Sequence, residues 1–139
     1  MFGSNDSKVY QWAEDIFVKD YYEICKHMLR SATKPQVYLI VPPPLYLSEN
    51  KFKFNQTIIN QRLPILVPTI GEQCGLPKEN IINLFEPMGG HDLSMPELFC
   101  VPDACDYFHP NEIGHDKMAK VIYKAIFGEE MQDVPTSVR

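Results

Sequence analysis

Apolar residues in the first third of the chain recur at helical spacing and then merge into one continuous run. Between Ala13 and Ser31 they fall three or four positions apart, which predicts an amphipathic helix with one buried face. The next segment, Gln36–Val41, is almost entirely apolar and β-branched. Such a run is typical of a parallel strand that is buried on both faces, and the prolines at 42–44 end it.

The same alternation is repeated in the middle of the chain. Residues Gln56–Gly75 carry an apolar face at helical spacing and predict a second helix. Pro64 and Pro68 lie inside it, and each removes a backbone donor, so we expect a kink or a split. A second short strand is predicted at Asn80–Phe85, where apolar residues again run together.

Both ends of the chain carry element boundaries. Met1–Gly3 is short and apolar, and we expect it to be the last part of a strand that enters a polar turn. A last helix is predicted over Glu112–Phe127. Asn111 is suited to be its N-cap and Gly128 to be its C-terminal stop.

This order of strands and helices predicts an α/β fold with a parallel sheet. In such sheets, ligand sites form at the carboxyl ends of the strands. The three polar loops of this chain each follow a predicted strand, at Gly3–Ser7, Pro42–Asn55 and Glu86–His109. We therefore expect these loops to meet at one edge of the sheet.

Composition and charge narrow the function classes. The 139 residues are enough for one domain, which we assign to residues 1–128, followed by a polar tail at 129–139. A net charge of −5 without a long Lys/Arg cluster argues against nucleic-acid binding. No apolar stretch approaches the roughly 18 residues of a membrane span. The N-terminus lacks the basic and apolar regions of a signal peptide, which favours an intracellular location.

The four cysteines do not form a recognisable disulfide framework or metal site. Cys100 and Cys105 are close enough in sequence to pair, whereas Cys25 and Cys74 are isolated. Without a signal peptide, reduced thiols are the simpler expectation for all four. No cysteine pair has the two-residue gap of a zinc knuckle, and the four histidines lack ligand spacing, so we expect no metal and no cofactor.

The residues best suited to catalysis lie just before the predicted last helix. Asp106 precedes His109 by three positions, on a loop that runs into that helix. An acid within reach of a histidine can fix its tautomer and make it a general base. A purely structural pair in a loop is the alternative interpretation.

Several stretches together resemble the SGNH hydrolases, also called the GDSL esterase/lipase family. Gly3–Asp6 is similar to the family's Gly-x-Asn-Asp block, and Asp106–His109 to its Asp-x-x-His block. The strand and prolines at 35–44 resemble the carbohydrate-acetylesterase branch, and His109–Ala119 is typical of family members. The resemblance implies a three-layer α/β/α, flavodoxin-like domain with a parallel sheet.

The resemblance also implies roles for individual residues. Asn5 matches the asparagine whose side-chain amide helps to form the oxyanion hole, although it is also an ordinary turn residue. His109 matches the general base, and Asp106 matches the acid that orients it. Gly3 and His91 lie on the same set of loops and are possible substrate contacts.

The chain departs from the family pattern in one large respect. The Gly-Asp-Ser block that carries the nucleophile is absent, and none of the serines follows Gly-Asp at the end of a strand. The chain resembles the C-terminal half of an SGNH domain whose first strands are missing. Loss of the serine costs about 10⁶ in rate, so we expect the chain to be inactive alone.

Two functions follow from this pattern. The first is half of an ester-hydrolase site, completed by a protein partner and acting on a small ester, with acetyl esters of sugars as the class that the resemblance implies. The second is a catalytically dead subunit that serves as a scaffold in a larger assembly. In both, a partner is expected to cover the open edge of the sheet, because an unpaired apolar strand edge favours association.

Overall fold

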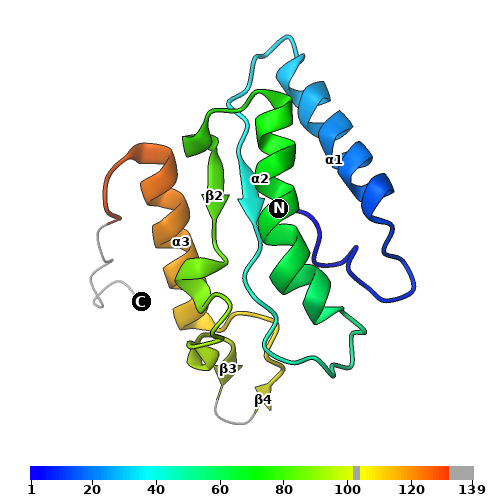
Figure 1. Cartoon of the computed structure of the whole chain (residues 1–139). Helices are drawn as coiled ribbons and strands as arrows, with labels where there is room; N and C mark the ends of the chain where they lie inside the picture. Colours follow the sequence, from blue (N-terminus) through cyan, green and yellow to red (C-terminus); the bar gives the residue numbers. More distant parts are fainter. Residues whose placement is uncertain (102–103, 132–139) are drawn as a thin grey trace.

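The computed structural model describes residues 1–101 and 104–131 and has a mixed α/β arrangement (Figure 1). Two short parallel strands, β1 (Leu39–Val41) and β2 (Ile81–Asn83), lie next to each other. They are accompanied by three helices, α1 (Glu14–Leu29), α2 (Leu63–Cys74) and α3 (Glu112–Phe127). Helix α1 packs on α2, α2 packs on the strands, and α3 lies beside β2. The predicted α/β character and the parallel pairing are therefore confirmed.

The helices lie where the hydrophobic pattern placed them. Helix α1 buries Phe17, Tyr21 and Cys25 along one face, at the expected spacing. The second helix changes from the π-helical segment Ile58–Arg62 to α2, but the backbone stays helical through Arg62 and Leu63, and α2 continues through Pro68. Pro64 lies in the first turn of α2, where its missing N–H costs little.

The strands are shorter than predicted. Parallel pairing joins only Leu39 to Ile81, Ile40 to Ile82 and Val41 to Asn83. A strand needs a neighbour to satisfy its backbone, and the two runs face each other over these three pairs alone. Within the described residues, Met1–Gly3 forms no strand, so the prediction of a strand end there is wrong. Phe2 instead packs edge-on against the ring of Tyr21, with centroids 5.2 Å apart.

A small antiparallel hairpin in the third loop was not predicted. Strand β3 (Cys100–Val101) pairs with β4 (Ala104–Cys105), and the register sets Cys100 opposite Cys105. Cys100 is disulfide-bonded, so the expectation of a reduced thiol is wrong for this residue. Cys25 and Cys74 are free and buried, as expected.

Helix α3 begins and ends as the sequence predicts. The side chain of Asn111 accepts a hydrogen bond from the backbone N–H of Gly114, at 2.9 Å, and Gly128 ends the helix in a left-handed conformation. The Asn111 amide also donates to the backbone carbonyls of Glu97 and Cys100. One side chain therefore ties the start of α3 to the end of the preceding loop.

The core lies between α1, α2 and the sheet. Its fully buried members include Val41, Ile59, Leu63, Val67 and Ile70. The buried side chain of Asn60 accepts from the backbone N–H of Leu45, at 2.8 Å, and donates to the Leu45 carbonyl, at 2.9 Å. These two hydrogen bonds fix the chain just after β1 and so determine where the following loop leaves the core.

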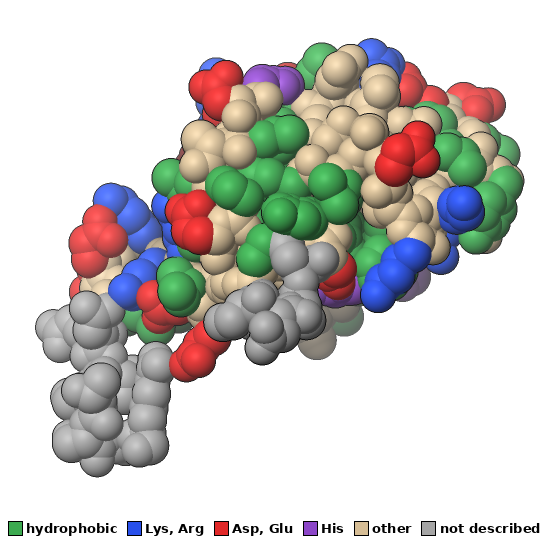
Figure 2. Space-filling model, turned by 90° about the horizontal axis from the view of Figure 1, so that it is seen from below, with side chains coloured by type: hydrophobic (Ala, Val, Ile, Leu, Met, Phe, Trp, Pro, Cys, Tyr) green, Lys and Arg blue, Asp and Glu red, His purple; other side chains and the backbone are tan. Residues whose placement is uncertain are grey.

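The exposed surface combines charged and hydrophobic areas. Seen from below, hydrophobic side chains gather in the middle of the face, with Lys, Arg, Asp and Glu toward its edges (Figure 2). Within residues 1–101 and 104–131, no helix has the length and hydropathy needed to cross a bilayer. Of the tail at 129–139, residues 132–139 lie outside the described residues.

Candidate active site

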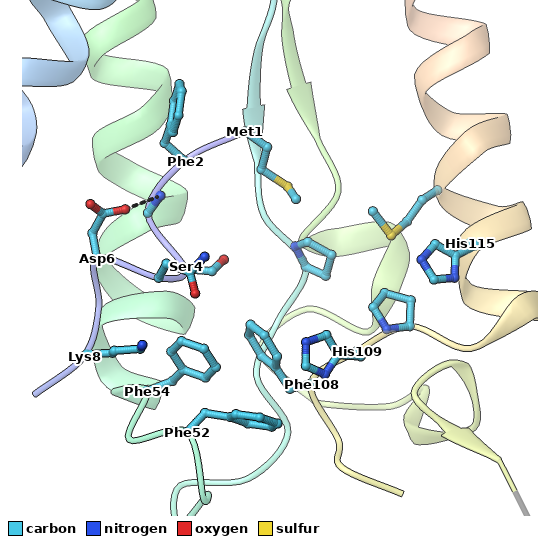
Figure 3. A pocket seen from close by; sticks show the side chains of 15 residues that line it. Met1, Phe2, Ser4, Asp6, Lys8, Phe52, Phe54, Phe108, His109 and His115 are labelled. Atoms are coloured by element: carbon cyan, nitrogen blue, oxygen red, sulfur yellow. Dashed lines mark hydrogen bonds between the residues drawn. The ribbon is translucent and has the colours of Figure 1, made fainter. Parts of the chain in front are cut away.

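A cavity of about 510 Å³ lies at the carboxyl ends of β1 and β2, where the predicted loops meet (Figure 3). It is lined by the N-terminal turn, by the loop that follows β1, and by residues that lead into α3. Asn5 and His109 both line it, from opposite ends of the chain. The expected convergence of the loops is therefore present.

Asp106 and His109 are joined by a direct hydrogen bond. The distance from His109 Nδ1 to Asp106 Oδ2 is 2.6 Å. The other carboxylate oxygen, Oδ1, accepts from the backbone N–H groups of Phe108, at 3.0 Å, and His109, at 2.8 Å. Both oxygens are thus engaged, and the His109 ring is left with Nε2 to act on a ligand.

The electrostatics keep this acid charged. Partial burial acts to raise the pKa of Asp106, but the hydrogen bonds from the His109 ring and from two backbone N–H groups outweigh it. The net effect holds the pKa of Asp106 below its ordinary value. The side chain of His109 is 61% exposed and that of Asp106 is 28% exposed, so the base faces solvent while the acid is partly covered.

The turn that carries the pair has an unusual backbone. Tyr107, between Asp106 and His109, has φ of +56°, a left-handed conformation that costs free energy for a residue with a side chain. The backbone N–H of Tyr46 donates to the Tyr107 carbonyl, at 3.3 Å. The three hydrogen bonds to Asp106 and this contact hold the turn in place.

The N-terminal turn is held by its own hydrogen bonds. Asp6 accepts from the backbone N–H of Gly3, at 3.1 Å, and the Ser7 hydroxyl donates to the Ser4 carbonyl, at 2.7 Å. Gly3 has φ of +113°, and a Cβ there would lie 2.7 Å from the Leu63 side chain. Glycine is therefore required at this point.

Asn5 lies at the tip of this turn and is exposed. Among the residues that the structure describes, its side-chain amide has no hydrogen-bond partner. An amide with both donors available, on the same cavity as a histidine base, can donate to a carbonyl oxygen that becomes negative. Gly3 also lines the cavity, as the sequence suggested.

The other histidines divide between the cavity and the surface. His91 does not line the cavity; its ring packs edge-on against Phe85, with centroids 4.9 Å apart. His115 is exposed, as predicted for the first turn of the last helix, but it also lines the cavity. The sequence did contain a signal that His115 could line the cavity: it lies one helical turn after Asn111, and that turn follows His109 directly.

The serines do not complete a triad. Ser4 lines the cavity, but within residues 1–101 and 104–131 no serine hydroxyl is hydrogen-bonded to His109. Ser7 is fully buried and bonded to the turn. Over the same residues, no group of three or more His, Cys, Asp or Glu side chains is placed to hold a metal ion.

An aromatic wall beside His109 was not predicted. The rings of Phe54 and Phe108 stack, with centroids 4.2 Å apart. The rings of Phe52 and Phe108 lie edge-to-face with His109, at 5.3 and 4.8 Å. The three phenylalanines in the sequence at 52, 54 and 108 carried no periodic pattern, so only the fold reveals that they form one surface.

Comparisons with protein-family models, curated proteins and solved structures found no match to this chain. The fold and the cavity define a mixed α/β protein with an acid-oriented histidine and an unpaired amide on a partly aromatic cavity.

Proposed function

We propose that residues 1–128 form the base-and-oxyanion half of an SGNH-type carboxylic ester hydrolase site. The observation that carries the proposal is that Asn5 and the Asp106–His109 pair, from opposite ends of the chain, line one cavity. An ester hydrolase needs a base and an oxyanion donor at the same carbonyl group. The nucleophilic serine comes from polypeptide outside residues 1–139.

Each residue has a defined chemical role in this proposal. His109 Nε2 takes the proton of the serine hydroxyl as it attacks the ester carbonyl and returns it to the leaving alcohol. Asp106 holds Nδ1 protonated and stabilises the imidazolium that forms. The amide of Asn5 donates to the carbonyl oxygen, which becomes negative in the tetrahedral intermediate; one such donor contributes about 10² to 10³ in rate.

Among the described residues, β1 pairs with a strand on one side only, through β2, and this supports completion by another strand on the other side. The Val41 carbonyl accepts from Leu84 on the β2 side, at 3.2 Å. Because the polar groups of successive strand residues point to opposite sides, those of Ile40 face away from β2. The Tyr21 hydroxyl lies near the backbone of Ile40 and Phe2, and burial raises the pKa of Tyr21 to about 12. We propose that a strand of the missing half pairs here and completes a three-layer, flavodoxin-like domain.

A second candidate function is a scaffold subunit without catalysis. It is favoured by exposed apolar side chains that line a second pocket together with Tyr21, namely Phe2 (50% exposed), Ile16 (56%) and Ile24 (43%). Such a surface fits a permanent protein contact. The two candidates differ in whether the polypeptide that docks here carries a serine within reach of His109.

The test is a fusion protein. An N-terminal segment that ends a strand with Gly-Asp-Ser is joined to Met1, so that its strand can pair with β1. Benzyl acetate is the substrate, because its unactivated ester does not react appreciably with an exposed imidazole. We expect hydrolysis by the fusion, and none above background by residues 1–139 alone or by the fusion in which that serine is alanine. A folded fusion that hydrolyses no benzyl acetate would favour the scaffold.

A further inference from the structure

The wall of the cavity next to His109 is a continuous aromatic surface. Phe52 lies 5.6 Å from Phe54 and 6.0 Å from Phe108, and Phe54 stacks on Phe108 (ring centroids). Phe54 is buried, whereas Phe52 and Phe108 are half-buried and offer part of their surface to the cavity. In Figure 3 the three rings and the His109 ring lie side by side at one end of the cavity.

The aromatic wall is well fixed. Asn50 accepts from the backbone N–H of Phe54, at 3.1 Å, and donates to its carbonyl, at 2.9 Å. The backbone N–H of Asn55 donates to the Ser7 carbonyl, at 3.1 Å, and Val9 donates to Lys53, at 3.2 Å. The loop that carries Phe52 and Phe54 is therefore bound to the N-terminal turn that carries Asn5.

Two lysines lie over rings of this wall: Lys51 Nζ is 5.0 Å from the centroid of Phe52 but does not line the cavity, whereas Lys8 does. The Lys8 ammonium lies 5.7 Å from the centroid of the Phe54 ring and lines the cavity. Across the described part of the chain, Lys8 forms no ion pair with a carboxylate. The cavity therefore offers a flat apolar face with an available positive charge beside it.

The rest of the lining mixes apolar and polar side chains. Met1, Phe2, Pro43, Pro110 and Met118 contribute apolar surface, and Ser4, Asp6 and His115 contribute polar groups away from the aromatic rings. A sugar ring carries several hydroxyl groups that each lose a water partner on binding and need a replacement. The rings of Phe52 and Phe108 offer no such replacement, so the part of a ligand that lies on them binds better when it is flat and apolar than when it is polyhydroxylated.

We infer that the site takes acetyl esters of aromatic alcohols that carry an anionic group, in preference to acetylated sugars. This inference rests on the proposed function and specifies its substrate class. The acetyl group lies between Asn5 and His109, the aromatic ring lies on Phe52 and Phe108, and the anion reaches Lys8.

The test uses three stable acetamides, in which an amide N–H replaces the ester oxygen. They are 4-acetamidobenzoate, acetanilide and the methyl glycoside of N-acetylglucosamine. Each is titrated into the full chain while the NMR signals of the His109 imidazole are recorded. We expect 4-acetamidobenzoate to bind about tenfold more tightly than the sugar, the advantage of one or two aromatic contacts. It should bind about threefold more tightly than acetanilide, as a partly exposed ion pair allows.

Matched variants separate the two contacts. Phe52→Leu should remove most of the difference in affinity between the two aromatic ligands and the sugar ligand. Phe127→Leu, at an exposed position of α3, should leave that difference unchanged. Lys8→Met should equalise 4-acetamidobenzoate and acetanilide, whereas Lys19→Met, on the exposed face of α1, should not.

The affinity order in the unmodified chain decides the inference even where a variant fails to fold. The sugar ligand binding as tightly as the aromatic ones, with a shift at His109, would overturn the substrate class and leave the ester-hydrolase proposal standing. If the aromatic ligands still bind more tightly than the sugar in Phe52→Leu, the assignment of their binding surface to the aromatic wall is wrong. Failure of the ester-hydrolase proposal has a separate signature, a folded fusion without activity toward benzyl acetate.

Discussion

Replacing His109 with alanine is expected to lower benzyl acetate hydrolysis by the serine-containing fusion about 10⁶-fold, which removes nearly all of the catalytic advantage. The reason is that a serine hydroxyl is a weak nucleophile until a base takes its proton. His109 is placed for this role because Asp106 engages Nδ1 at 2.6 Å and leaves Nε2 for the serine. The measurement is kcat for benzyl acetate.

Asp106→Asn should cost about 10⁴ in the same assay, because an amide allows the wrong histidine tautomer. His27→Ala is the control, since His27 is exposed on α1 and outside the cavity. Its kcat should equal that of the parent fusion. Equal rates for the parent and for His109→Ala would contradict the role of His109 as the base.

Gly114→Ala is expected to destabilise the fold by about 3 kcal/mol, at the upper end of overpacking costs. A Cβ at this position would lie 2.3 Å from the Leu98 carbonyl oxygen and 2.9 Å from Pro110 Cβ. The backbone of Leu98 cannot move away freely, because its carbonyl also accepts from the N–H of Asn111, at 2.8 Å. The loss is measured as the change in free energy of unfolding in urea.

Gly128→Ala is the matched control. Gly128 has φ of +74° but no atom within 4 Å of the added Cβ, so only backbone strain is introduced. We expect a loss of about 1 kcal/mol there. Equal losses at the two glycines would show that Gly114 is not closely packed against Leu98.

In Gly114→Ala, the displaced start of α3 should also disturb Pro110 and His109, which lie on the same cavity.

Much of the framework could be predicted from local sequence signals. The limits of α3 follow from the Asn111 cap and Gly128, both of which act within one helical turn. The contact between Asp106 and His109 was also predictable, because three residues of a turn bring the two side chains together. The change from the π-helical segment to α2 lies just before Pro64, whose missing N–H is a local property.

The remaining features depend on contacts between distant segments. Whether Met1–Gly3 is a strand depends on a neighbour to pair with, and the described residues supply none. The β3–β4 hairpin and the disulfide of Cys100 depend on how the third loop folds back. Phe52 and Phe108 are far apart in sequence, so their contact at 6.0 Å has no local signal.

The proposed ester site requires that Asn5 and His109 act on one ligand. The most direct measurement is an NMR titration of the full chain with N-methylacetamide, following the side-chain amide of Asn5 and the imidazole of His109 together. We predict that both signals shift with the same dissociation constant, and that His109→Ala weakens the shift at Asn5. A shift at only one of the two residues, or two different dissociation constants, would contradict a shared ester site.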